Sequence, residues 1–125
     1  MAQPLHFQNL SDLVRQMREG SLSALEVTEH HLERIAALEP DLHAFAQVRA
    51  EAARADARAA DAKRKRGEPL GSLHGAPIAV KDLCAMAGTD TRAGGFFSTG
   101  FAPTDTATVV HRLQQAGAII VGKAQ

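Results

Sequence analysis

The fold class of this chain rests on one stretch, Ala76-Pro77-Ile78-Ala79-Val80-Lys81-Asp82-Leu83. It is short, mostly apolar and preceded by the turn-forming residues 68–71, so it predicts a strand. A second apolar run of strand length, Ala118-Ile119-Ile120-Val121, follows later in the sequence. A helical pattern separates the two runs, and strand, helix, strand in this order is typical of a parallel sheet. We therefore predict an α/β fold.

The segment between the two strands is expected to be a loop followed by one helix. Residues 87–106 are rich in Gly, Thr and Ser, which favours a loop. We expect Asp105 or Thr106 to cap the helix and Gly117 to end it. Two apolar strands do not complete a sheet, because such strands need cover on both faces and partners on both edges. The sequence therefore predicts the first strands of a larger, helix-covered sheet.

Before these strands the sequence favours helices. Ser11 is expected to cap a first helix that ends at Gly20. The stretch Ser23-Ala24-Leu25-Glu26 has the pattern of a capping box, in which each side chain bonds a free backbone N–H at the start of a helix. Pro40 is expected to end that second helix.

A third helix is predicted from Phe45 to Arg66, where Ala, Arg and Asp predominate. Arg58 and Asp61, and likewise Asp61 and Lys65, have the spacing of ion pairs on one helix face. Gly67 suits the position after the last helical turn.

The change of character after this helix divides the chain in two. We expect an N-terminal helical arm over residues 1–67 and a truncated start of the α/β core over residues 68–125. The 125 residues, 45% of them hydrophobic, are enough to bury one core.

Composition excludes several classes of function. Fourteen Lys and Arg balance fourteen Asp and Glu, so no net charge draws the chain to nucleic acid or to an anionic membrane. The single Cys84 forms no internal disulfide, which fits a reducing cytoplasm. The N-terminus lacks the basic start and apolar stretch of a secretory signal, and no apolar run is long enough to cross a bilayer.

Lys81 is the candidate catalytic residue. Alternation along the strand places it on one face with Ala79 and Leu83, near the carboxyl end, where open α/β sheets bind their ligands. Lysine is seldom buried unless it is paired or functional. Burial can lower a lysine pKa by about 3–5 units, which would let the neutral amine take a proton from a hydroxyl nucleophile. The alternative is structural: a lysine that reaches water at a strand end, or pairs with Asp82 or another acid.

The segment Gly71-Ser72-Leu73-His74-Gly75-Ala76-Pro77-Ile78-Ala79-Val80-Lys81-Asp82 resembles the amidase signature family, in which a Leu-His-Gly turn feeds a strand ending in Val-Lys-Asp. Residues 103–110 and 113–123 resemble the next helix and strand of the family in order. Upstream, Glu33-Arg34-Ile35 and Leu42-His43-Ala44-Phe45 resemble its N-terminal arm. The resemblance implies an incomplete form of the family's fold, whose sheet is mixed.

The resemblance also implies amide bond hydrolysis by a Ser–Ser–Lys triad through an acyl-enzyme, with Lys81 as the lysine and no cofactor or metal. The Gly/Ser-rich segment that carries both serines is absent, so we expect them beyond Gln125, in the remainder of the amidase core. The partners implied are that remainder and a small-molecule amide. Gly95 stands where the family's loop commonly has Ser, and Ser98 lacks the glycine–serine cluster, so neither is assigned a catalytic role.

Other motifs are weaker. Gly117–Lys123 has the spacing of a P-loop, but its centre is strand material and Ala124 replaces the Ser or Thr that binds Mg²⁺. We therefore interpret Lys123 as structural and Cys84 as a small core residue. The basic run 63–66 is interpreted as a solvated helix end. No metal-ligand spacing is found among His30, His31, His43, His74 and His111, and His74 is expected to support its turn.

Three alternatives stay open. The parent protein is an amide hydrolase, or it is the A-type component of an amidotransferase that acts on misacylated tRNA, or the chain is a truncated, non-catalytic module with a binding or assembly role. Self-association into a homo-oligomer is also open, because the isolated chain would expose apolar strand edges.

Overall fold

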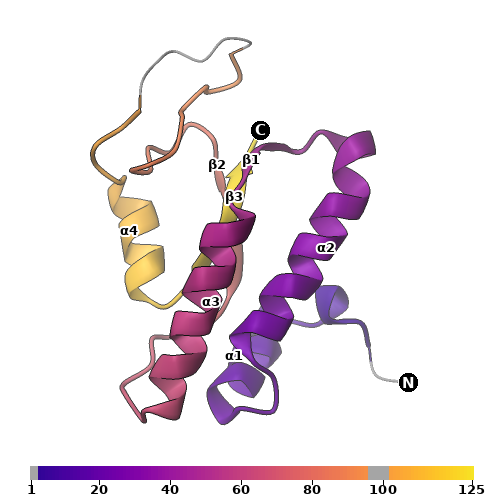
Figure 1. Ribbon diagram of the computed structural model, residues 1–125, viewed down its shortest axis with the longest axis vertical. Coiled ribbons are helices and arrows are strands. Elements are labelled where there is room, and N and C mark those ends of the chain that lie inside the picture. The colour runs from indigo at the N-terminus through magenta and orange to yellow at the C-terminus, as the bar shows by residue number, and fades with distance from the viewer. Residues whose placement is uncertain (1–2, 96–101) are drawn as a thin grey trace.

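The computed structural model describes residues 3–95 and 102–125. Its elements follow the chain in this order: η1 (Leu5–Phe7), α1 (Leu10–Glu19), α2 (Ala24–Leu42), β1 (Phe45–Val48), α3 (Ala50–Lys65), β2 (Pro77–Lys81), α4 (Thr108–Gln115) and β3 (Ile119–Ala124). The three strands form one sheet in the order β1-β3-β2 (Figure 1). β2 and β3 are parallel, as predicted, and β1 is antiparallel to β3. The predicted α/β class and mixed, helix-covered sheet are confirmed.

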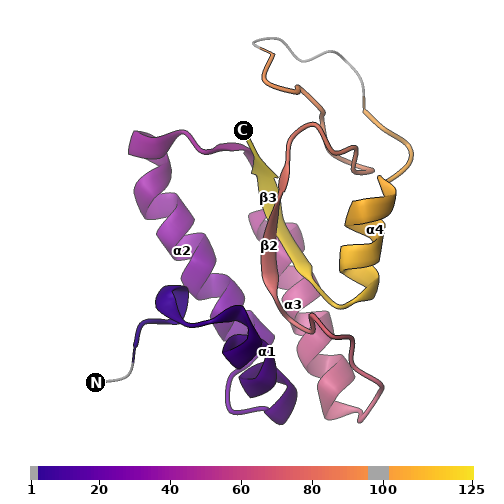
Figure 2. The ribbon, with the colours of Figure 1, turned by 180° about the vertical axis from the view of Figure 1, so that it is seen from behind.

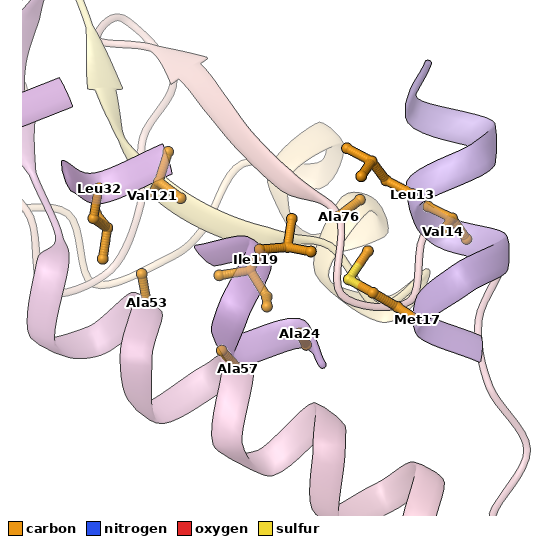
Figure 3. Packing of buried hydrophobic residues seen from close by; sticks show 11 residues of the cluster. Leu13, Val14, Met17, Ala24, Leu32, Ala53, Ala57, Ala76, Ile119 and Val121 are labelled. Carbon is orange, nitrogen blue, oxygen red and sulfur yellow. The ribbon is translucent and has the colours of Figure 1, made fainter. Parts of the chain in front are cut away.

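Helices lie on both faces of the sheet. Seen from behind, β2 and β3 run side by side, and their carboxyl ends meet at the edge where the loop after β2 begins (Figure 2). The larger hydrophobic cluster joins α1, α2 and α3 to one face of β3 (Figure 3). Its buried members are Leu13, Val14, Met17, Ala24, Val27, Leu32, Ala53, Ala57, Ala76, Ile119 and Val121. The smaller cluster lies between the sheet and α4 and consists of Val80, Met86, Val110 and Ile120.

The start of α2 follows the predicted capping box. The Ser23 hydroxyl accepts the N–H of Glu26 at 3.0 Å, and the Glu26 carboxylate accepts the N–H of Ser23 at 2.8 Å. Gly20 ends α1 with a φ of 85°, as expected. The Ser11 cap is wrong, because the Asn9 carbonyl already accepts the first helical N–H groups and α1 begins one residue before Ser11.

Pro40 does not end α2, contrary to expectation. A proline removes one backbone N–H from a helix, but it leaves the next turn free to form if the following N–H groups still reach their carbonyls. The N–H of His43 bonds the carbonyl of Glu39 at 2.9 Å, and His43 ends the helix in the left-handed region with φ 47°. The Glu39 carboxylate then accepts the N–H groups of Ala44 and Phe45.

The predicted third helix is wrong over its first residues. Phe45–Val48 form β1, which pairs with β3, and α3 begins only at Ala50. The alanines of α3 still have a packing purpose, since Ala53 and Ala57 are fully buried and let the helix approach the sheet closely. Gly67 follows the helix with φ 70°, as predicted.

α4 begins without the predicted side-chain caps. Its N-cap position is Ala107, and the Thr106 hydroxyl instead accepts the N–H of Ala87 at 3.1 Å across the loop. Asp105 makes no cap either. Gly117 ends the helical turn with φ 96°, as expected. Residues 87–95 and 102–106, the described part of the predicted loop, contain no helix or strand. Among the helices of the described residues, none has the length and apolar character needed to cross a membrane.

Candidate functional site

Lys81 lies at the carboxyl end of β2, and its side chain is exposed. The predicted alternation is confirmed: Val80 and Asp82 are buried, whereas Ala79, Lys81 and Leu83 are exposed. The expected burial of Lys81 is not seen in this chain. Within residues 3–95 and 102–125 no hydrogen bond or ion pair involves the Lys81 ammonium group.

The face of the sheet that carries Lys81 is partly open, since Ala79 and Lys81 are both exposed on it. A groove of about 290 Å³ runs between α2 and the sheet. It is lined by His31, Arg34, Ile35, Leu38, Glu39, Leu42, Ala44, Phe45, Pro77, Ala79 and Val121. Ala79 precedes Lys81 by two residues on the same face of β2, so the groove and the lysine lie on one side of the sheet.

Lys123, not Lys81, is the buried lysine. Its side chain is 0% exposed, and its Nζ lies 3.3 Å from the Asp82 carboxylate. The same Nζ donates to the carbonyl of Asp90 at 2.9 Å and lies 3.1 Å from the hydroxyl of Thr91. A lysine without solvent needs such partners, because burying an unpaired charge is very unfavourable. The structural role predicted for Lys123 is confirmed, and a pairing of Lys81 with Asp82 is wrong.

Asp82 ties the loop after β2 to the end of the sheet. Its Oδ2 accepts the N–H of Arg92 at 3.0 Å and the N–H of Ala93 at 2.8 Å. Ala93 has φ 48°, a conformation that residues other than glycine adopt only when their surroundings impose it. The Asp82–Lys123 pair therefore holds residues 90–93 in a defined conformation beside the end of β2.

One extra residue in β3 decides which face Lys123 occupies. Ile78 pairs with Ile120, but Ala79 pairs with Gly122, so Val121 is an inserted residue with no partner in this register. After this bulge Lys123 pairs with Val80 and shares the face of Val80 and Asp82. In an unbroken register Lys123 would stand opposite Lys81, and two cations would be neighbours on one face. The bulge separates them.

The other candidate nucleophiles among the described residues show no catalytic arrangement. Cys84 is half-buried and packs against the smaller cluster, as expected for a core residue. Ser23 is used in the capping box, and the Ser21 hydroxyl lies 3.3 Å from the carbonyl of Gln16. Ser98 lies outside the described residues.

The histidines also have structural surroundings. His74 is buried in the turn before β2, and burial lowers its pKa while the nearby Asp61 carboxylate acts in the opposite direction. His6 Nδ1 lies 2.8 Å from His30 Nε2, with the rings stacked at 5.1 Å. Within the described part of the chain no three His, Cys, Asp or Glu residues gather as metal ligands.

The basic and glycine-containing motifs are explained by the fold. The run at residues 63–66 ends α3, and the Arg66 side chain pairs with Glu68. The P-loop-like spacing forms the turn into β3 and β3 itself, as the sequence indicated. The feature that sequence reasoning missed is the Asp82–Lys123 network, because the position of the bulge gives no signal in the local pattern.

Comparisons with known proteins agree with this arrangement. The family model described as Amidase matches residues 26–125. The A-type component of the glutamyl-tRNA(Gln) amidotransferase of Chloroflexus aggregans is 44% identical over 119 residues, which cover 95% of this chain and 24% of that protein. A Mycobacterium bovis protein that bears the name amidase AmiD is 47% identical over 119 residues, with the same coverage. The native peptide amidase of Stenotrophomonas maltophilia superposes with a TM-score of 0.89 at 36% identity, covering 98% of this chain and 25% of that one.

The chain thus spans about a quarter of the length of the relatives it matches. The family match covers both strands of the site and the loop between them. It bears out the resemblance carried by the turn, the strand and Lys81, and the chain belongs to the amidase signature family.

Proposed function

We propose that this chain supplies the lysine base of an enzyme that hydrolyses amide bonds, with Lys81 in that role. One observation carries the proposal: two lysines lie at the carboxyl ends of neighbouring strands, and only one is available. Lys123 is buried and bonded to Asp82, Asp90 and Thr91, whereas the Lys81 ammonium group is exposed on the open face. An exposed lysine at a strand end is placed for proton transfer.

The proposed reaction needs groups beyond this chain. By family resemblance, one serine attacks the amide carbonyl, and its proton passes through a second serine to the neutral Lys81 amine. The same proton then goes to the leaving nitrogen, and water hydrolyses the acyl-enzyme to release the acid. One base that takes and returns a proton suits amides, because the leaving nitrogen must be protonated. The remainder of the core would supply both serines and the backbone N–H groups that stabilise the oxyanion.

The open face around Lys81 supports this division of labour. Only the neutral amine of a lysine can accept a proton. Cover by the rest of the core, over the groove beside Ala79 and Val121, would remove water and favour the neutral amine. The lysine and its strand would thus be set by this chain, and the desolvation by the part that completes the sheet.

A second candidate is the A-type component of an amidotransferase that acts on misacylated tRNA. The 44% identity to that component of a glutamyl-tRNA(Gln) amidotransferase favours it, and the 47% identity to a protein named as an amidase favours the hydrolase. Both would use the same lysine chemistry. They differ in the fate of the nitrogen. The hydrolase releases it into solvent as ammonia or an amine, whereas the transferase passes the freed ammonia to an acceptor.

The test uses the longest protein encoded by the reading frame that contains this chain. Hydrolysis of a panel of simple amides is measured for the wild type, Lys81→Ala and the control Lys65→Ala, whose exposed side chain lies at the end of α3. We expect Lys81→Ala to lower kcat by about 10²–10⁴-fold and to abolish labelling by a serine-directed fluorophosphonate. Lys65→Ala should match the wild type.

Each other outcome has a definite meaning. Activity that appears only with glutamine and a misacylated tRNA would favour the amidotransferase. Wild-type activity that survives Lys81→Ala would refute the role of Lys81. A protein with no activity on any of these substrates would favour the non-catalytic module.

A further inference from the structure

We propose that Lys123 is a positioning residue for Lys81: its buried ammonium neutralises Asp82, and the bulge at Val121 keeps it on the opposite face of the sheet. This inference rests on the proposed function, because it assigns Lys123 and Asp82 a purpose in the working of that site. Neither touches the reacting atoms; both act through the charge and backbone around Lys81.

The geometry gives the pair two tasks. The first is mechanical. The N–H of Asp82 bonds the carbonyl of Ala124 at 2.7 Å, and its carboxylate holds the N–H groups of Arg92 and Ala93. The residue directly after Lys81 is therefore fixed to β3 and to the loop at once. Such anchoring limits the movement of the Lys81 backbone at the strand end, where a free chain would fray.

The second task is electrostatic. Asp82 is adjacent to Lys81 in the chain and is 2% exposed, so its charge is poorly screened by water. An unpaired carboxylate there would favour the charged form of the neighbouring lysine, which is the wrong form for a base. Lys123 cancels that charge from β3. Asp90 and Arg92 of the loop line the same pocket as Asp82, and they pair with each other at 3.2 Å.

The bulge makes this arrangement possible. Without the inserted residue Val121, Lys123 would face the same side as Lys81 and would leave Asp82 without its partner. Gly122, next to the bulge, allows β1 to approach, since a Cβ there would lie 2.6 Å from the Gln47 carbonyl oxygen. The sheet thus brings Lys123 to Asp82 and leaves the Lys81 side chain exposed on the opposite face.

The experiment compares three variants of the longest protein of the reading frame: Lys123→Met, Asp82→Asn and the double variant. The measurement is the pH dependence of kcat/KM for amide hydrolysis. Lys123→Met leaves the Asp82 carboxylate without its cation, which favours the charged form of Lys81. The acidic limb of the kcat/KM profile should therefore move to higher pH by about half a unit. Asp82→Asn leaves Lys123 uncompensated, so the limb should move the opposite way by a similar amount. The double variant should return close to the wild type.

A purely structural role would not produce shifts of opposite sign that cancel. Hydrogen exchange at the amides of Arg92 and Ala93 is measured in parallel, and Lys123→Met should accelerate it at least tenfold.

If Lys123→Met does not fold, Asp82→Asn alone decides, since an acidic limb that stays in place or moves to higher pH overturns the proposal. Loss of activity in Lys81→Ala with unshifted limbs in all three variants would overturn this inference and leave the proposed function standing. A wild type without amidase activity would overturn the proposed function first, and this role with it.

Discussion

Asp61 of α3 holds the first turn of α2 through the backbone of Ala24. Its Oδ1 accepts the N–H of Ala24 at 2.7 Å, and its Oδ2 accepts the N–H of Leu25 at 3.1 Å. A helix start has free N–H groups and a positive end of the helix dipole, so a carboxylate there is doubly favourable. The ion pairs predicted from Asp61 to Arg58 and Lys65 do not form, because this contact between helices takes both carboxylate oxygens.

Asp61→Ala should therefore destabilise the chain by about 1–2 kcal/mol, the range for the loss of a helix cap. The matched control is Asp56→Ala, an exposed acid on the same helix, which should change the free energy of unfolding by less than about 0.5 kcal/mol. Urea unfolding monitored by circular dichroism measures both. Equal effects of the two substitutions would contradict the capping role.

Gly71→Ala should be more damaging, for a steric reason. A Cβ at Gly71 would lie 2.1 Å from the carbonyl oxygen of Ala116 and 2.4 Å from its carbonyl carbon. Both atoms belong to the backbone at the turn into β3, which cannot yield as a flexible side chain would. We expect a loss of about 3 kcal/mol in the free energy of unfolding.

The control for this substitution is Ser72→Ala, at the exposed neighbouring position. It should leave the urea midpoint nearly unchanged. A Gly71→Ala variant as stable as Ser72→Ala would show that the turn before β2 and the turn before β3 are not in the close contact described.

Local signals in the sequence predicted local features well. The capping box at Ser23 and Glu26 and the helix-ending glycines Gly20 and Gly117 depend on residues within one or two turns of each other. Lys81 and its place at a strand end also followed from a short run, since alternation along a strand needs no knowledge of the rest of the chain.

Features that depend on distant partners were missed or wrong. Residues 45–48 form a strand only because β3, more than seventy residues later, offers an edge. Lys123 became the buried lysine because one inserted residue changed its face, and an insertion leaves no mark on the apolar pattern. The exposure of Lys81 depends on what covers the groove beside α2, which is a property of packing and not of β2.

The groove gives a prediction about association. Leu42 lines it and is 63% exposed, and Phe7 is equally exposed but lies on η1, outside the groove. We expect the isolated chain to associate through its open face, so Leu42→Ser should weaken self-association and Phe7→Ser should not. Sedimentation over a hundredfold range of concentration measures this. A wild-type chain that stays monomeric and melts cooperatively would contradict the prediction.

His74 should make stability depend on pH below neutrality. Its side chain is 2% exposed, and burial, aided by the charges of Arg18 and Lys63, lowers its pKa below the ordinary 6.5 despite the opposing Asp61 carboxylate. The unfolded chain therefore binds a proton at this histidine more readily than the folded chain. By linkage, the free energy of unfolding falls as pH drops below about 6.5 and is independent of this group above it. His74→Asn should flatten the dependence of the urea midpoint on pH between pH 5 and pH 6.5, although it also lowers stability throughout. The control is His111→Asn, at an exposed position on α4, which should leave this dependence unchanged. A slope that survives His74→Asn would assign the pH dependence to another group and would mean that the buried imidazole is protonated as readily in the folded chain as in the unfolded one.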